Sequence, residues 1–161
     1  MIFQEENQLL QHIKLGHLYR VYLLYGEEKY LKELYLKRLV RLASPGQFEE
    51  FNFHRFDGGE LEVDRLIEAC ESLPFLAGQR CVVVEKFDFE GMPAADREKL
   101  TRLLEDPPET TVLILVVDKE DFSAKKSAGA KKLIALCDKA GAVLELKRRS
   151  MSDLVRFIRS R

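Results

Sequence analysis

The sequence predicts a three-layer α/β domain in which about five parallel strands lie between two layers of helices. Two observations favour this class. Short apolar runs alternate with amphipathic segments along the chain, and most of the runs are continuous, which is typical of strands covered on both faces. Parallel strands also need crossovers of a dozen or more residues, and the amphipathic segments are long enough to supply them.

The first half of the chain is expected to contribute two strands and three helices. Val21 to Tyr25 is a continuous apolar run stopped by Gly26. Phe51 to His54 alternates in polarity instead, as an edge strand with one less covered face does. The segments between and after these runs carry apolar residues at helical spacing. The expected order is helix 5–16, strand 21–25, helix 28–43, strand 51–54 and helix 63–73.

The second half continues the alternation with three more strands. The run from Thr111 to Val117 is the longest apolar run and is rich in β-branched residues, so we expect it at the centre of the sheet. A further helix is expected to begin at Met151. The expected order before it is strand 81–84, helix 94–105, strand 111–117, helix 126–139 and strand 142–146.

Composition excludes several classes of protein. Of 161 residues, 46% are hydrophobic and 33% are charged, and no run approaches the roughly 18 apolar residues that span a membrane. Acids at Glu5 and Glu6 stand where a signal peptide carries basic residues, so we expect a cytoplasmic protein. Cys70, Cys81 and Cys137 lie far apart among apolar neighbours, which indicates small buried side chains and neither disulfides nor a metal site.

Charge is distributed unevenly along the chain. Residues 1–118 contain 14 Lys and Arg against 22 Asp and Glu, whereas residues 119–161 contain 12 against 5. A basic C-terminal quarter of this kind is compatible with nucleic-acid binding through Lys125-Lys126, Lys131-Lys132 and Lys147-Arg148-Arg149. Solvated helix faces whose signs happen to segregate explain it equally well.

The segment from Ser72 to Arg80 places large apolar side chains in a loop. Pro74 and Gly78 break regular structure there, between an expected helix and an expected strand. Leu73, Phe75 and Leu76 either fold back to cap the core or form a small exposed plug for a pocket on another protein. The residues alone leave both alternatives open.

The turn after the first long strand lacks the residues of a phosphate-binding loop. It reads Tyr25-Gly26-Glu27-Glu28-Lys29-Tyr30, with one glycine, no Gly-Lys-Ser/Thr, and two carboxylates where an anion needs free amides. At the end of the third strand, Lys86 follows Glu85 where an ATPase would carry a water-orienting acid, and a lysine does not serve as a base near neutral pH. We therefore expect no catalytic residues, no cofactor and no ATP hydrolysis.

The histidines also suggest no catalytic or metal site. His12, His17 and His54 share no spacing with Ser, Cys or acidic partners that would form a triad or a metal centre. We expect His12 and His17 on the solvated side of the first helix and His54 pointing outward from the edge strand.

Several of these segments, taken in order, resemble the delta subunit of the bacterial DNA polymerase III clamp loader. The resemblance covers nearly the whole chain and is specific because the pieces keep their order and spacing. The segments that carry it are residues 21–28 with Tyr30-Leu31, Phe56-Asp57-Gly58, Leu73-Pro74-Phe75-Leu76, residues 80–85, residues 104–108 and residues 140–143.

The resemblance implies an AAA+-like (RecA-like) domain with a degenerate P-loop over residues 1–149, followed over residues 150–161 by the start of a truncated helical lid. It implies a non-catalytic subunit, within the DNA polymerase holoenzyme, that binds and helps open the beta sliding clamp for loading onto primed DNA. Leu73, Phe75 and Leu76 are the clamp-binding residues that it implies.

Further partners follow from the same resemblance. In the full-length protein they are the tau/gamma and delta prime subunits, and primed DNA is contacted through the complex. We expect no contact with a membrane, and we expect this fragment to be a monomer. The alternative to this reading is a nucleotide-binding ATPase or switch domain whose phosphate loop has diverged.

Overall fold

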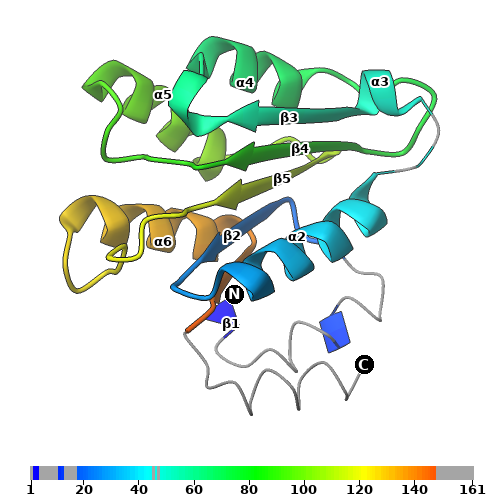
Figure 1. The fold of residues 1–161 in the computed structure, drawn as a ribbon. Coiled ribbons are helices and arrows are strands. Elements are labelled where there is room, and N and C mark those ends of the chain that lie inside the picture. The colour runs from blue at the N-terminus through cyan, green and yellow to red at the C-terminus, as the bar shows by residue number, and fades with distance from the viewer. Residues whose placement is uncertain (1, 4–10, 13–17, 45, 47, 148–161) are drawn as a thin grey trace.

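A single parallel sheet of six strands organises the domain. The computed structural model describes residues 2–3, 11–12, 18–44, 46 and 48–147. The strand order is β1-β6-β2-β5-β4-β3, and every pair of neighbours is parallel (Figure 1). The strands are β1 Ile2–Phe3, β2 Val21–Tyr25, β3 Phe53–Asp57, β4 Arg80–Glu85, β5 Thr111–Val116 and β6 Ala142–Glu145.

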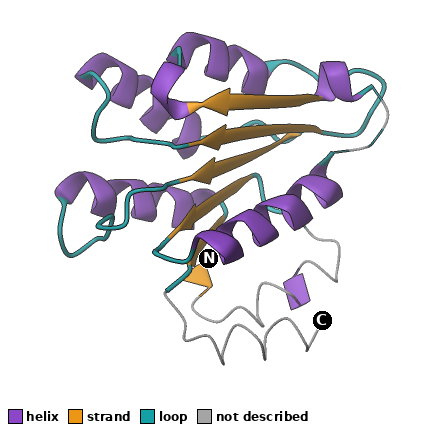
Figure 2. Cartoon of the chain, viewed as in Figure 1, coloured by secondary structure: helices purple, strands orange, loops and turns teal. Residues whose placement is uncertain are grey.

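Helices cover both faces of this sheet, which gives the three layers (Figure 2). Helix α2 packs on one face, and α4, α5 and α6 pack on the other. The short α3 immediately precedes β3, and a 3₁₀ turn over Gly58–Glu60 follows it. The helices are α2 Lys29–Ala43, α3 Glu49–Asn52, α4 Val63–Glu71, α5 Ala94–Glu105 and α6 Ala128–Ala140.

The core lies in two clusters, one on each face of the sheet. Successive residues of a strand point to opposite faces. In β2, Leu23 therefore packs against α4, α5 and α6, while Tyr22 and Leu24 pack against α2. Every residue of β2 and of β5 is buried, which is why these strands appear in the sequence as continuous apolar runs.

The three-layer parallel sheet that the sequence predicts is confirmed. All five predicted strands are present, and α5 has the predicted bounds. β1 adds a sixth strand beside β6, and two residues are too few for a periodic pattern to reveal. The three cysteines are buried as predicted, and burial raises the pKa of each thiol to about 12.

Two expectations for single residues or short segments were wrong. Residues 51 and 52 belong to α3 and not to a strand, because the Phe51 and Asn52 amides both donate to the Phe48 carbonyl and close a helical turn. His12 is not simply solvated, because its Nε2 lies 2.7 Å from the Tyr22 hydroxyl and its ring stacks on Tyr19.

Some predicted elements lie wholly or partly outside the described residues. Of helix 5–16, only residues 11 and 12 are described, and both are helical. The helix predicted from Met151 and the boundary between residues 149 and 150 lie outside the described residues. Among the described residues, no helix is long and apolar enough to cross a membrane.

Candidate functional site

The loop over residues 72–80, called here the apolar loop, connects the end of α4 to the start of β4. It therefore lies at the amino edge of the sheet, where the strands begin, together with α3 and the last turn of α2 (Figure 1). The exposed fractions are 79% for Leu73, 71% for Leu76 and 45% for Phe75. Leu73 and Leu76 do not cover the core, and Phe75 is packed on one side only.

Asn52 holds the backbone of this loop at Phe75. Its side-chain amide donates to the Phe75 carbonyl at 2.7 Å and accepts from the Phe75 amide at 2.6 Å. Asn52 is fully buried, whereas Phe75 is partly exposed, so both hydrogen bonds are part-buried. One carboxamide thus satisfies both backbone polar groups of Phe75. The ring of Phe75 takes no part in these hydrogen bonds.

Two residues at the end of the loop, Gln79 and Arg80, form further hydrogen bonds to backbone carbonyls. The Arg80 guanidinium donates to the Leu73 carbonyl at 3.1 Å and also meets the His54 ring. Gln79 donates to the Ala43 carbonyl at 2.8 Å, one of the carbonyls that the C-terminus of α2 leaves without a helical partner. That His54 points outward from the edge strand stays a prediction: the residue is half-buried, with its Nε2 against Arg80 and 3.1 Å from the Phe51 carbonyl oxygen.

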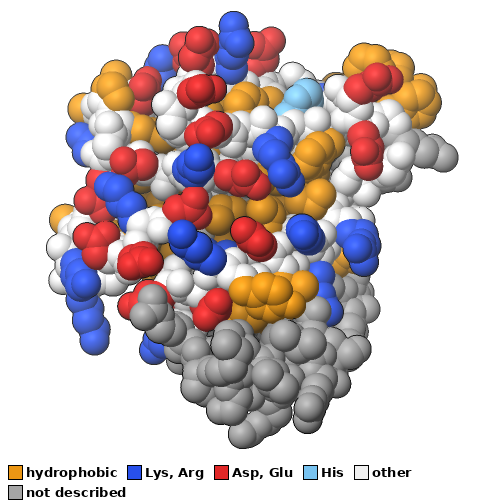
Figure 3. All heavy atoms as spheres, in the orientation of Figure 1, with side chains coloured by type: hydrophobic (Ala, Val, Ile, Leu, Met, Phe, Trp, Pro, Cys, Tyr) orange, Lys and Arg blue, Asp and Glu red, His pale blue; other side chains and the backbone are white. Residues whose placement is uncertain are grey.

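Three aromatic rings gather beside the loop. The Phe75 ring packs edge-on against Phe48, with 5.3 Å between centroids, and lies 4.9 Å from the ring of Phe51. Phe48 and Phe51 are themselves 41% and 48% exposed. Figure 3 shows hydrophobic side chains projecting at the upper right of the molecule, at the place of α3 in Figure 1.

The backbone is unusual at two points of this surface. Phe48 has a φ of 56° and Leu76 a φ of 50°, in the left-handed region that bulky side chains rarely adopt. Such a conformation costs on the order of 1–3 kcal/mol and persists where the surroundings hold it. Here the surroundings include the Asn52 and Arg80 hydrogen bonds, so the loop is both strained and anchored.

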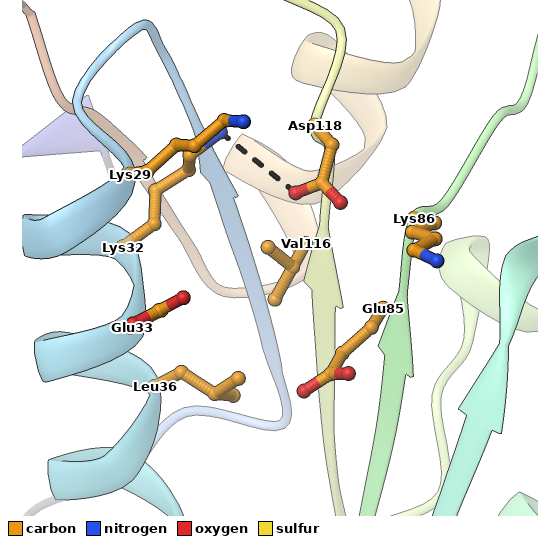
Figure 4. Close-up of a pocket in the computed structure, with 8 residues that line it drawn as sticks. All are labelled: Lys29, Lys32, Glu33, Leu36, Glu85, Lys86, Val116 and Asp118. Carbon is orange, nitrogen blue, oxygen red and sulfur yellow. Dashed lines mark ion pairs between the residues drawn. The ribbon is translucent and has the colours of Figure 1, made fainter.

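A second region lies at the opposite edge of the sheet, where the strands end. A cleft of about 330 Å³ opens there between α2 and the ends of β4 and β5 (Figure 4). Open α/β sheets usually bind ligands at this edge. Charges of both signs line the cleft beside two apolar residues: Lys29, Lys32, Glu33, Leu36, Glu85, Lys86, Val116 and Asp118.

Lys32 is the residue of this cleft that sequence reasoning missed. It stands six positions after Gly26, the spacing that separates the first glycine from the lysine in a phosphate-binding loop, and counting from Gly26 finds it. Its side chain is buried, donates to the Val117 carbonyl at 3.1 Å and lies 3.8 Å from Asp118. Burial lowers the pKa of the Lys32 ammonium, and the Asp118 carboxylate opposes that shift.

The turn over residues 26–28 and the first residues of α2 are held by several contacts. The Glu28 amide donates to the Leu146 carbonyl at 3.2 Å, and the Glu28 carboxylate accepts from the Tyr30 amide at 3.3 Å. Gly26 has a φ of 122°, and a Cβ placed on it would lie 2.1 Å from the Leu146 carbonyl oxygen. Two amides at this place, those of Glu28 and Tyr30, therefore already have acceptors.

The remaining charged groups form surface pairs or solvated faces. Glu85 pairs with Arg55 at 3.4 Å, and Lys86 lies 3.9 Å from Asp57. On and before α6, Lys125, Lys126, Lys131 and Lys132 are exposed, whereas Arg148 and Arg149 lie outside the described residues. In the part of the chain that is described, no group of three or more His, Cys, Asp or Glu side chains could hold a metal ion.

Comparison with protein families assigns most of the chain to one family. Residues 22–147 match the family described as "DNA polymerase III, delta subunit". DNA polymerase III subunit delta of Bacillus subtilis (strain 168) is 25% identical over 151 residues, which cover 90% of this chain and 42% of that protein. The chain thus spans less than half the length of this relative.

Solved structures share the fold. The Bacillus subtilis DNA clamp loader delta protein matches with a TM-score of 0.76 at 24% identity, over 95% of this chain and 45% of that one. A DNA polymerase III gamma subunit-related protein of Thermotoga maritima has a TM-score of 0.58 at 15% identity, over 96% and 49%. The P-loop NTPase domain of a sigma-54 transport activator from E. coli has 0.50 at 14%, over 91% and 95%.

Proposed function

Because this chain belongs to the family of the DNA polymerase III delta subunit, we propose that it binds the beta sliding clamp and helps to open it for loading onto primed DNA. The clamp contact is made by Leu73, Phe75 and Leu76 of the apolar loop. We propose further that the tau/gamma and delta prime subunits are its partners in the clamp loader, and that the cytoplasm is its location.

The observation that carries this proposal is the combination of exposed side chains with an anchored backbone. Asn52, Gln79 and Arg80 satisfy polar groups at and around the loop, while Leu73 and Leu76 extend into solvent. Fully burying a leucine or phenylalanine contributes roughly 1.5–3 kcal/mol. A loop held in one conformation loses little further entropy on binding, so more of this contribution is available for affinity.

The cleft at the carboxyl edge supports a non-catalytic role for the chain. A polyphosphate needs free backbone amides and a free lysine. Lys32 already donates to Val117, and the Glu28 and Tyr30 amides already have acceptors. We propose that the ATP site is degenerate and that this chain contributes binding to a clamp loader and no hydrolysis.

One observation favours the alternative, a nucleotide-binding switch domain. Lys32 lines an open cleft at the spacing of a phosphate-loop lysine, so breaking its contact to Val117 would free a cation for phosphate. This alternative requires affinity for Mg·ATP, which the proposed clamp-binding function does not.

The test is a calorimetric titration of the chain with a purified beta sliding clamp. We expect Phe75→Ala/Leu76→Ala to weaken binding by about a hundredfold or more, the range of interface hot spots. Leu73→Ala/Leu76→Ala removes atoms from side chains that are mostly exposed. It should weaken binding about tenfold or more while lowering the free energy of unfolding by less than about 0.5 kcal/mol.

Tyr30→Ala is the matched control, because Tyr30 is an aromatic residue that is 47% exposed at the far end of α2. It should bind the clamp like the unsubstituted chain. Full clamp affinity in both loop variants would refute the proposal. A titration with Mg·ATP in place of the clamp should give no heat of binding, and tight magnesium-dependent binding would favour the switch domain instead.

A further inference from the structure

Phe48 and Phe51 form an aromatic shelf at the start of α3, beside the apolar loop. Both are large aromatic residues that are nearly half exposed, and they belong to a helix of only four residues and its N-cap. Exposing these rings to solvent does not stabilise such a short helix. Their rings face one side of Phe75, so the exposed surface runs without a break from the shelf through Phe75 to the loop. Glu49 and Glu50, both exposed, lie between the two phenylalanines in sequence and provide a charged rim.

Asn52 couples the shelf to the loop. It is the last residue of α3, so the shelf and the carboxamide belong to one rigid turn closed by the Phe51 and Asn52 amides on the Phe48 carbonyl. The same carboxamide forms hydrogen bonds with both the amide and the carbonyl of Phe75. The position of Phe75 relative to Phe48 and Phe51 is therefore set by two part-buried hydrogen bonds and two ring contacts.

We propose that Phe48 and Phe51 contact the sliding clamp together with the apolar loop, and that Asn52 is the positioning residue that holds Phe75 against them. This inference rests on the proposed clamp-binding function. The clamp is the occupant because the shelf is continuous with the loop through Phe75, and because an apolar centre with a charged rim is the usual composition of a protein interface.

The residues of this surface differ in how exposed their side chains are, and we expect their roles in binding to differ accordingly. Leu73 and Leu76 are free on most sides and can enter a pocket, whereas Phe75 is held on one side by the shelf. Aromatic side chains that present a large rigid area are typical interface anchors. The shelf accordingly widens the contact area around the leucines and fixes the direction in which they point.

The first test is the double variant Phe48→Ala/Phe51→Ala of the full chain, titrated with purified beta sliding clamp. We expect the clamp Kd to rise about tenfold or more. Tyr30→Ala, with a matched exposed aromatic outside the surface, should leave it unchanged. Unchanged or tighter clamp binding by the shelf variant, alongside lost binding by Leu73→Ala/Leu76→Ala, would overturn the shelf and leave the proposed function standing.

The second test addresses Asn52 and does not depend on the clamp. In the unsubstituted chain, the Phe75 amide should be protected from hydrogen exchange, because its acceptor is a buried carboxamide oxygen. In Asn52→Ala we expect this protection to fall while amides of β5 keep theirs. Rapid exchange of the Phe75 amide in the unsubstituted chain would overturn the positioning role, even where Asn52→Ala fails to fold.

Calorimetry separates positioning from general stability. If Asn52→Ala frees the loop, its clamp binding should weaken with a more unfavourable entropy, since the loop must then be ordered on binding. Weakening with an unchanged entropy would contradict the positioning role. Absence of clamp binding by the unsubstituted chain would overturn both this inference and the proposed function.

Discussion

The two edges of the sheet differ in which groups form the hydrogen bonds to the backbone. At the amino edge, side chains of Asn52, Gln79 and Arg80 satisfy backbone groups in and near the apolar loop. At the carboxyl edge, the backbone carbonyls of Leu146 and Val117 accept from the Glu28 amide and the Lys32 ammonium. The anchored loop at the amino edge carries exposed leucines, whereas at the carboxyl edge the Glu28 amide and the Lys32 ammonium already have acceptors.

Under the proposed function, this chain keeps the frame of the fold while its functional surface lies at the amino edge of the sheet. Open α/β sheets bind ligands beyond the carboxyl ends of their strands. In this chain, Leu73 and Leu76, its two most exposed large apolar side chains among the described residues, lie beyond the amino ends. Under the proposed function, the fold alone would point to the carboxyl edge, so function has to be argued from the site.

The largest expected difference between the two edges concerns their glycines. Gly26→Ala places a Cβ 2.1 Å from the Leu146 carbonyl oxygen at a φ of 122°. It should lower the free energy of unfolding by roughly 3 kcal/mol or more. Gly78→Ala in the apolar loop meets no heavy atom within 4 Å. It should change the free energy of unfolding by less than about 1 kcal/mol, and in the stabilising direction.

Urea denaturation of the two alanine variants measures this difference. Equal losses of stability would mean that Gly26 does not pack against Leu146 as closely as the 2.1 Å approach indicates. A large loss for Gly78→Ala would mean that the apolar loop packs more closely than its exposed side chains indicate.

A smaller effect is expected from Lys32 as pH rises. Burial lowers the pKa of Lys32 in the folded chain, whereas the unfolded chain titrates near its ordinary value of 10.5. Between these two values the unfolded state binds the extra proton, so the free energy of unfolding rises with pH. Relative to Lys32→Met, the unsubstituted chain should therefore gain stability as pH increases toward 10.5, with no such gain near pH 7.

Paired denaturation curves from neutral to alkaline pH test this prediction, because other titrating groups cancel in the difference. A difference that falls as pH rises would indicate that Asp118 outweighs burial and holds Lys32 charged. In that case the cleft would contain a stabilised cation, and the contrast between the two edges would weaken.

The sequence predicts the frame well because burial on both faces leaves a direct signal. Continuous apolar runs mark β2, β4 and β5, and helical stripes mark the crossovers. The presence of a loop is also visible, since Pro74 and Gly78 interrupt an otherwise apolar segment, but its exposure is not. These signals are local, so no knowledge of the tertiary structure is needed to find them.

The anchoring of the loop has no local signal. Asn52 lies between Phe51 and Phe53, and an alternating aromatic pattern favours a strand. Its hydrogen-bond partner, Phe75, is 23 residues away, and the pairing arises only when α3 and the loop meet at the amino edge. The aromatic shelf was missed for the same reason, because the contacts of Phe48 and Phe51 with Phe75 are tertiary.

Hydrogen–deuterium exchange of the full chain with and without purified beta sliding clamp tests the central claim most directly. The proposed contact predicts that segments 48–53 and 72–80 gain protection on adding the clamp, while segment 26–33 does not change with the clamp or with Mg·ATP. Protection confined to segment 26–33, with exchange in the apolar loop unaffected, would contradict it.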